Sequence, residues 1–180
     1  MKVTLCEGKH LRLVARRQWE YVERTSASGI VAVLAVTDDP NLILTEQYRL
    51  PVDRRVIELP AGLAGDVAGA ETEDLISAAQ RELREETGYE AQQFDFLFEG
   101  PPSAGATSEV IRFFRATGLR RVGPGGGEGN ESIQLHEIPL STAEQWLEQK
   151  YREGVLIDPK VYAGLYFASR TADRRPDSYA

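Results

Sequence analysis

Three glutamates in one short stretch are the strongest chemical signal in the sequence. Glu82, Glu85 and Glu86 stand at positions i, i+3 and i+4, so on a helix their side chains share one face. Grouped carboxylate oxygens are the ligands that Mg²⁺ and Mn²⁺ prefer. At the C-terminal end of a helix the macrodipole disfavours each anion by roughly 0.3–1 kcal/mol. A bound cation would offset that cost, and a fully solvated acidic helix end is the alternative explanation of the same spacing.

The element that must position these glutamates is an amphipathic helix. Apolar residues recur at helical spacing over positions 75–83. The pattern predicts a helix from near Thr72 to Gly88, where glycine can adopt the left-handed conformation that ends a helix. Glu82 and Glu86 fall on the stripe that carries the apolar side chains. We therefore expect two carboxylates at the margin of the face that packs against the core.

Two segments around this helix resemble the Nudix box. The first reads Glu-Leu-Pro-Ala-Gly over residues 58–62. The second begins at Glu73, continues with seven residues, and ends Arg-Glu-Leu-Arg-Glu-Glu-Thr-Gly-Tyr over residues 81–89, which matches the box at every defined position. Ten residues separate Gly62 from Glu73, where the pattern has five. The lengthened segment predicts a loop over residues 62–71, and the spacing of the glutamates is unaffected.

Composition limits the kinds of partner that the chain can have. Its 180 residues are enough for one domain with a sizeable core. A net charge of −7 argues against non-specific nucleic-acid binding. The single cysteine, Cys6, cannot form an intramolecular disulfide, which fits a reducing compartment. No apolar run approaches the ~18 residues of a membrane span, and no secretory signal is visible at the N-terminus. We expect a cytoplasmic protein with no nucleic-acid and no membrane partner.

The order of elements along the chain predicts a mixed α+β fold. Helices are expected at the glutamate cluster, from a capping box at Ser141 to about Tyr151, and over residues 159–169. We expect a small N-terminal β-hairpin region over residues 1–28 and a second domain with the C-terminal helices over residues 29–180. Period-two alternation or a continuous apolar run predicts strands over residues 3–5, 11–15, 19–24, 30–36, 42–48, 56–59, 94–98, 109–116 and 133–138.

The resemblance extends beyond the box and implies a fold. Gln47-Tyr48-Arg49, the Trp19-Glu20 pair followed by Arg24, and the loop from Pro102 to Glu109 are similar to the nucleoside diphosphate-sugar branch of the Nudix hydrolases, above all the ADP-ribose pyrophosphatases. Members of this family share an α/β/α sandwich around a mixed β-sheet. This branch usually forms a homodimer through an N-terminal β region, so the resemblance implies a homodimer here.

The resemblance also assigns a role to each matching residue. Glu82 and Glu86 would bind the metal, Mg²⁺ or Mn²⁺, with Glu85 close by and the backbone carbonyl of Ala61 as a further ligand. Glu86 also belongs to the expected catalytic set. The remaining roles would be those of Arg49 on a substrate phosphate, Trp19 stacked on the base, and Glu20 and Arg24 beside it. The resemblance allows the last three side chains to come from the same chain or from the partner subunit.

The catalytic base in this branch comes from a late loop. Glu131 matches that place best, with Glu128 as the alternative. Divalent ions neutralise phosphates and activate water, so the implied reaction is hydrolysis of a nucleoside diphosphate-sugar, with ADP-ribose giving AMP and ribose 5-phosphate. Two alternatives stay open at this stage: GDP-mannose or another nucleotide sugar as the substrate, and a domain that senses a nucleotide without cleaving it.

Overall fold

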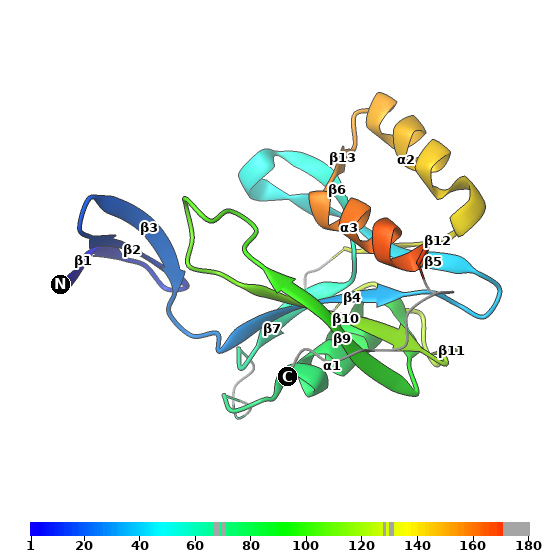
Figure 1. Cartoon of the computed structure of the whole chain (residues 1–180), viewed down its shortest axis with the longest axis horizontal. Coiled ribbons are helices and arrows are strands. Elements are labelled where there is room, and N and C mark those ends of the chain that lie inside the picture. Colours follow the sequence, from blue (N-terminus) through cyan, green and yellow to red (C-terminus); the bar gives the residue numbers. More distant parts are fainter. Residues whose placement is uncertain (67–68, 70, 128, 130–131, 171–180) are drawn as a thin grey trace.

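The computed structural model describes residues 1–66, 69, 71–127, 129 and 132–170. In these residues the chain forms three α-helices and thirteen β-strands that pair into four sheets (Figure 1). None of the helices in this part of the chain is long and apolar enough to cross a membrane. The mixed α+β class predicted from the sequence is confirmed.

The N-terminal residues form a three-stranded antiparallel sheet of their own. It consists of β1 (Lys2–Glu7), β2 (Leu11–Arg16) and β3 (Trp19–Arg24). Figure 1 shows this sheet at one end of the long axis, away from the helices. The long loop after β9 joins it to the rest of the chain, because Val22 N–H donates to the Ala106 carbonyl at 2.9 Å and Ser108 N–H to the Val22 carbonyl at 3.1 Å.

Two four-stranded sheets form the body of the molecule. The first has the order β7 (Ala61–Ala64), β4 (Gly29–Ala35), β10 (Ile111–Thr117) and β9 (Gln93–Gly100), and it is mixed because only β4 and β10 run parallel. The second has the order β12 (Gln134–Pro139), β5 (Asn41–Arg49), β6 (Arg54–Glu58) and β13 (Leu156–Ile157). A two-stranded ribbon joins β8 (Tyr89–Glu90) to β11 (Arg120–Arg121).

Helices cover both faces of these sheets. Helix α1 (Leu75–Thr87) lies on one face, and α2 (Ala143–Arg152) and α3 (Pro159–Ala168) lie on the other (Figure 1). Alternate residues of β4 divide between two cores: Val31 and Val33 pack with Leu83 of α1, whereas Ala32 and Leu34 pack with α2 and α3. This arrangement is the α/β/α sandwich that the family resemblance implied.

Several predicted boundaries are wrong. Part of the expected loop over residues 62–71 is strand β7, because its backbone pairs with β4 from Gly29 to Ala32. Helix α1 starts three residues later than predicted, since the Asp74 side chain accepts hydrogen bonds from the N–H groups of Ile76 and Ser77. Ser141 is not an N-cap, because it lies inside a 3₁₀-helix (Leu140–Thr142) that leads directly into α2.

Candidate metal and active site

Helix α1 is a rigid support for the acidic cluster. The Asp74 carboxylate caps its first turn, and Gly88 ends it with φ 71°, a left-handed conformation that favours glycine. Ala79 and Leu83 are fully buried on its inner face. The side chains of Glu82 and Glu86 therefore project from fixed positions beside that face.

The carboxylates of Glu82 and Glu86 lie against the start of β7. Glu86 Oε2 accepts a hydrogen bond from the Ala61 N–H at 3.0 Å. A Cβ added to Gly62 would stand 1.9 Å from the carboxyl carbon of Glu82, so this glycine makes room for that carboxylate. The structure thus brings together Glu82, Glu86 and Ala61, three of the four metal-binding residues expected from the sequence.

Burial changes the proton affinity of both carboxylates. It raises the pKa of Glu82 to about 7, although hydrogen bonding and charge from Arg81 oppose the rise. Burial also raises the pKa of Glu86 well above its ordinary value, against the hydrogen bond from Ala61, and the nearby negative charges of Glu82 and Glu58 act in the same direction as burial. Burial is thus the main cause of both raised pKa values, and the charges of neighbouring carboxylates add to it.

This donor set fits a hard divalent cation. Mg²⁺ is usually held by one or two carboxylates and completes its octahedral shell with water and substrate phosphate oxygens. Within the described residues no three acidic, histidine or cysteine side chains converge into a fuller set of ligands. Glu82, Glu86 and the Ala61 carbonyl could hold such an ion only together with water or substrate oxygens.

Arg81 forms salt bridges with several of the surrounding acidic side chains. Its Nε donates to Glu73 at 3.0 Å, and its Nη1 donates to Glu82 at 2.8 Å and to Glu85 at 3.1 Å. Its Nη2 donates to the carbonyl of Leu63 on β7 at 2.8 Å. The sequence-based interpretation of Arg81 as a structural partner of the glutamates is confirmed. The same contacts join α1 to β7, and so connect the two halves of the Nudix box across the lengthened segment between Gly62 and Glu73.

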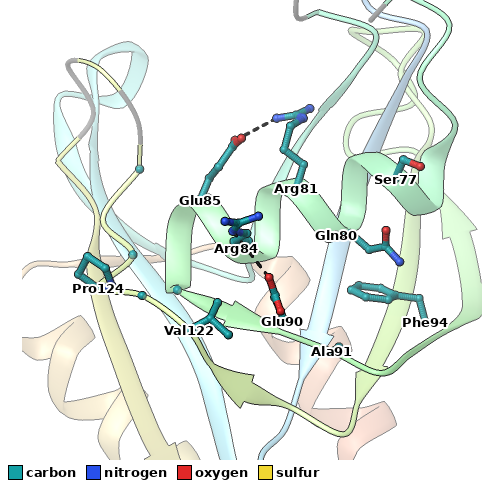
Figure 2. Close-up of a pocket in the computed structure, with 14 residues that line it drawn as sticks. Ser77, Gln80, Arg81, Arg84, Glu85, Glu90, Ala91, Phe94, Val122 and Pro124 are labelled. Carbon is teal, nitrogen blue, oxygen red and sulfur yellow. Dashed lines mark hydrogen bonds and ion pairs between the residues drawn. The ribbon is translucent and has the colours of Figure 1, made fainter.

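Glu85, which the spacing placed on one face with Glu82 and Glu86, lines a cavity that neither of those two side chains lines. Its side chain is 25% exposed and borders this cavity of about 850 Å³, which Figure 2 shows between the outward face of α1 and the glycine-rich segment 122–127. Arg81 and Glu85 lean toward each other at the edge of this cavity, and Arg84 points toward Glu90 across it. The cavity is therefore separate from the place where Glu82 and Glu86 meet β7.

The glycine-rich segment is fastened to the C-terminal end of α1. Gly126 N–H donates to the Glu86 carbonyl at 2.9 Å, and Gly127 N–H donates to the Glu85 carbonyl at 3.0 Å. A Cβ on Gly125 would lie 2.5 Å from the Thr87 carbonyl carbon, so only glycine permits this approach. The two candidate bases follow this anchor along the chain. Both Glu128 and Glu131 lie outside the described residues.

Arg49, the expected phosphate ligand, lies at the end of β5 and is held by a carboxylate that the sequence interpretation did not assign. Its Nε donates to Glu58 Oε2 at 2.7 Å, and the Glu58 side chain is only 8% exposed. The signal that could have revealed this pair is the hairpin itself. Arg49 and Glu58 belong to the two strands of one hairpin, β5 and β6, and antiparallel pairing brings these strands together.

Trp19 lines a second cavity of about 440 Å³ at the N-terminal sheet. Its neighbours there are Arg16, Arg17, Tyr21 and the loop over residues 104–108. Strand alternation places Glu20 and Arg24 on the opposite face of β3 from Trp19, and Arg24 Nε donates to Glu109 at 2.7 Å. Glu20 and Arg24 thus face away from the cavity that Trp19 lines in the same chain, and their expected role beside the base stays a prediction.

Comparison with known proteins places these features in a family. The NUDIX domain model matches residues 28–154. The chain is 36% identical over 123 residues to the methanol dehydrogenase activator of Bacillus methanolicus, covering 68% of this chain and 64% of that protein. It is 45% identical over 95 residues to an ADP-ribose pyrophosphatase of Mycobacterium tuberculosis, covering 53% and 44%. It is 32% identical over 155 residues to a GDP-mannose pyrophosphatase of Cronobacter sakazakii, covering 82% and 75%.

A solved structure and the length of the match complete the comparison. The crystal structure of an ADP compounds hydrolase superposes with a TM-score of 0.69 at 22% identity, covering 94% of this chain and 90% of that one, which shows a shared fold. The chain spans less than two thirds of the length of the first two relatives. Because the domain model covers more than half of the chain and includes the glutamate cluster, this protein belongs to the Nudix family.

Proposed function

We propose that this protein is a divalent-metal-dependent hydrolase of nucleoside diphosphate-sugars, and that it cleaves ADP-ribose to AMP and ribose 5-phosphate. The observation that carries the proposal is the pair of buried carboxylates, Glu82 and Glu86, held by α1 against β7 with pKa values raised by burial. Relatives named ADP-ribose pyrophosphatase support the choice of substrate.

The metal site follows from the donor set. Nudix hydrolases generally depend on a divalent metal, and Mg²⁺ is the expected ion, with Mn²⁺ as the second choice. When bound, the ion would neutralise phosphate charge and lower the pKa of a water molecule. Glu82, Glu86 and the Ala61 carbonyl would hold it, with Glu85 nearby. Arg49 orients the diphosphate by donating to a phosphate oxygen.

A separate glutamate takes the proton of the attacking water. Glu131 is our first choice and Glu128 the second, since both follow the segment that Gly126 and Gly127 anchor at the end of α1. Glutamine at the true base should lower kcat by roughly 10²–10⁴-fold and change KM little, because general-base catalysis acts on the chemical step. Equal activity of Glu131→Gln and Glu128→Gln to the unmodified protein would contradict this assignment.

The base of the nucleotide stacks on Trp19. This indole is 56% exposed, although it lines the cavity shared with Tyr21, and an exposed aromatic face suits a planar ring. Arg16 and Arg17 border the same cavity. Trp19→Ala should raise KM by about tenfold, since an aromatic contact contributes about 1–2 kcal/mol. The melting temperature should not change, because the side chain is exposed in the single chain.

A homodimer would cover the face of the N-terminal sheet opposite Trp19, where Leu11 and Leu13 pair with Arg24 and Val22. Val3, Leu5, Leu11 and Leu13 of the N-terminal sheet are each 36–50% exposed, and an apolar group of this kind marks an interaction surface. A second copy of the chain is the expected occupant. Light scattering after size-exclusion chromatography should report a dimer, and Leu13→Lys should shift it toward monomer. A monomer in the unmodified protein would refute this part of the proposal.

A product assay tests the reaction itself. The purified protein is incubated with ADP-ribose, GDP-mannose and other nucleoside diphosphate-sugars, once with Mg²⁺ and once with EDTA, and the products are identified. Metal-dependent AMP release from ADP-ribose confirms the proposal, provided that Glu82→Gln is folded and inactive. Relatives named GDP-mannose pyrophosphatase favour the second substrate, for which GMP is the diagnostic product. Ligand-induced stabilisation without cleavage would instead indicate a sensor.

A further inference from the structure

The side chain of Arg49 is anchored at one point. The contact between its Nε and Glu58 Oε2 is 2.7 Å long, and it joins a half-exposed arginine to a nearly buried carboxylate: the side chains are 43% and 8% exposed. Within the described residues, Glu58 is the only acidic side chain that lies within 4.0 Å of the Arg49 guanidinium. The orientation of this guanidinium therefore depends on Glu58.

The register of the two strands shows how strongly this contact constrains the arginine. Thr45 of β5 lies opposite Glu58, whereas Arg49 lies opposite Arg54. Arg49 is four residues beyond Thr45, which is about 13 Å along an extended strand. To reach Glu58, its side chain must fold back along β5 toward the interior of the sheet. An arginine without such an anchor would extend into solvent at the strand end.

This backward orientation brings the guanidinium toward the glutamates of α1. Glu58 stands three residues before Ala61, whose N–H donates to Glu86 at 3.0 Å, so the pair is near the metal-binding carboxylates. The charges of Arg49 and Glu58 both act on the pKa of Glu86, in opposite directions. The anchor uses Nε, and the Nη groups make no hydrogen bond to the described residues. A guanidinium has five N–H donors. Four of them can therefore reach the oxygens of a diphosphate while Glu58 holds the fifth.

We propose that Glu58 is a positioning residue: it fixes Arg49 so that the Nη groups face the substrate phosphates, and it keeps this arginine from pairing with Glu86. Glu58 itself touches neither metal nor substrate. This inference deepens the proposed function and rests on it. Its physical basis is that Glu86 can bind a cation only if Arg49 does not neutralise it first.

A double-mutant cycle tests this role. Kinetic constants for ADP-ribose with Mg²⁺ are measured for the unmodified protein, Glu58→Ala, Arg49→Ala and the double variant. Loss of a charged hydrogen bond to substrate should lower kcat/KM by about 10- to 100-fold in Arg49→Ala. Glu58→Ala should cause about a tenfold loss alone and less than about a twofold loss when Arg49 is already alanine.

Two further variants separate orientation from general damage. Glu58→Gln keeps an acceptor for Nε, so it should recover a large part of the activity that Glu58→Ala loses. Arg54→Ala is the matched control, since Arg54 is an exposed arginine opposite Arg49 on the same hairpin, and its kcat/KM should not change. Thermal unfolding of each variant confirms that the fold is retained.

The outcomes distinguish the inference from the proposed function. An equal loss on Glu58→Ala with and without Arg49 would overturn the positioning role. A loss of Mg²⁺ affinity that persists in the Arg49→Ala background would also overturn it, because Glu58 would then be a ligand. If the unmodified protein cleaves no nucleotide sugar, the proposed function fails. The same cycle is then measured by calorimetry with Mg²⁺ and inorganic pyrophosphate, where additive losses, or no loss, would overturn the inference.

Discussion

Replacing Glu82 with glutamine should remove a large part of the pH dependence of stability in the metal-free protein. Burial raises the pKa of Glu82 from 4.5 to about 7 in the folded state. The folded state therefore favours the protonated carboxyl more than the unfolded state does. Stability from this group is complete below the unfolded pKa and is lost as the pH rises through the folded pKa.

The size of the effect follows from the same difference. A pKa that rises from 4.5 to about 7 corresponds to roughly 3 kcal/mol, at 1.36 kcal/mol per pKa unit. The side chain of Glu82 is only 12% exposed, so solvent screening takes away little of this value. Glutamine is neutral at every pH and keeps the shape of the side chain. The variant should therefore be more stable than the unmodified protein above about pH 7, by up to ~3 kcal/mol.

Urea denaturation of the two proteins in EDTA provides the measurement. The free energy of unfolding is determined at several values between about pH 5 and pH 8, and the two curves are subtracted to cancel the titrating groups that do not interact with Glu82. Glu86 contributes to the difference in the same direction, because the charge of Glu82 raises its pKa. Repeating the series with saturating Mg²⁺ tests the link to metal. The ion should stabilise the unmodified protein more at high pH, because it binds the ionised carboxylates, and should stabilise the variant far less.

Parallel pH curves would refute this reasoning. If both proteins lose stability equally between about pH 5 and pH 8, then burial does not raise the pKa of Glu82 in the folded state. If Mg²⁺ stabilises Glu82→Gln as much as the unmodified protein, then Glu82 is not a ligand. Either result would remove the reason to expect a cation beside Glu82.

Two further substitutions test the residues that hold the glutamates of α1 in place. Gly62→Ala should lower Mg²⁺ affinity and activity at least about tenfold, because the new Cβ would occupy the place of the Glu82 carboxylate. Titration with Mg²⁺ measures the affinity. Gly100→Ala is the control and should be neutral, because the space around Gly100 is open. Arg81→Ala should destabilise the fold by about 3 kcal/mol in urea, since it leaves partly buried carboxylates unpaired. Arg84→Ala, at a 68% exposed arginine, should change stability by less than about 0.5 kcal/mol.

The centre of the site could be predicted because its signals are local. Helical spacing, the terminal Gly88 and the face shared by Glu82 and Glu86 all depend on residues within four positions of one another. The structure confirms the helix and its glycine end, and it places the carboxylate of Glu86 against Ala61 and that of Glu82 against Gly62. Long apolar or alternating runs likewise predicted the principal strands, since periodicity reports burial directly.

The remaining features depend on contacts between distant segments. Strand β7 is too short and too rich in glycine to show a strand pattern, and it exists because β4 offers it a pairing edge. The separation of Trp19 from Glu20 follows from simple alternation, but the family pattern had suggested that they act together. Glu58 could be connected to Arg49 only with the register of the hairpin known. The ribbon of β8 and β11, two residues per strand, carries no usable periodicity.

The two arginines of the site explain why its negative charge remains available to a metal. Arg81 pairs with Glu73, Glu82 and Glu85, and the pKa of Glu82 is raised in spite of this pairing. Arg49 of β5 donates its hydrogen bond to Glu58 and not to Glu86. Within the described residues, Glu86 thus receives a hydrogen bond from a neutral backbone amide and no direct ion pair. A buried carboxylate without an ion pair has a raised pKa. A bound divalent cation would stabilise its ionised form and lower that pKa.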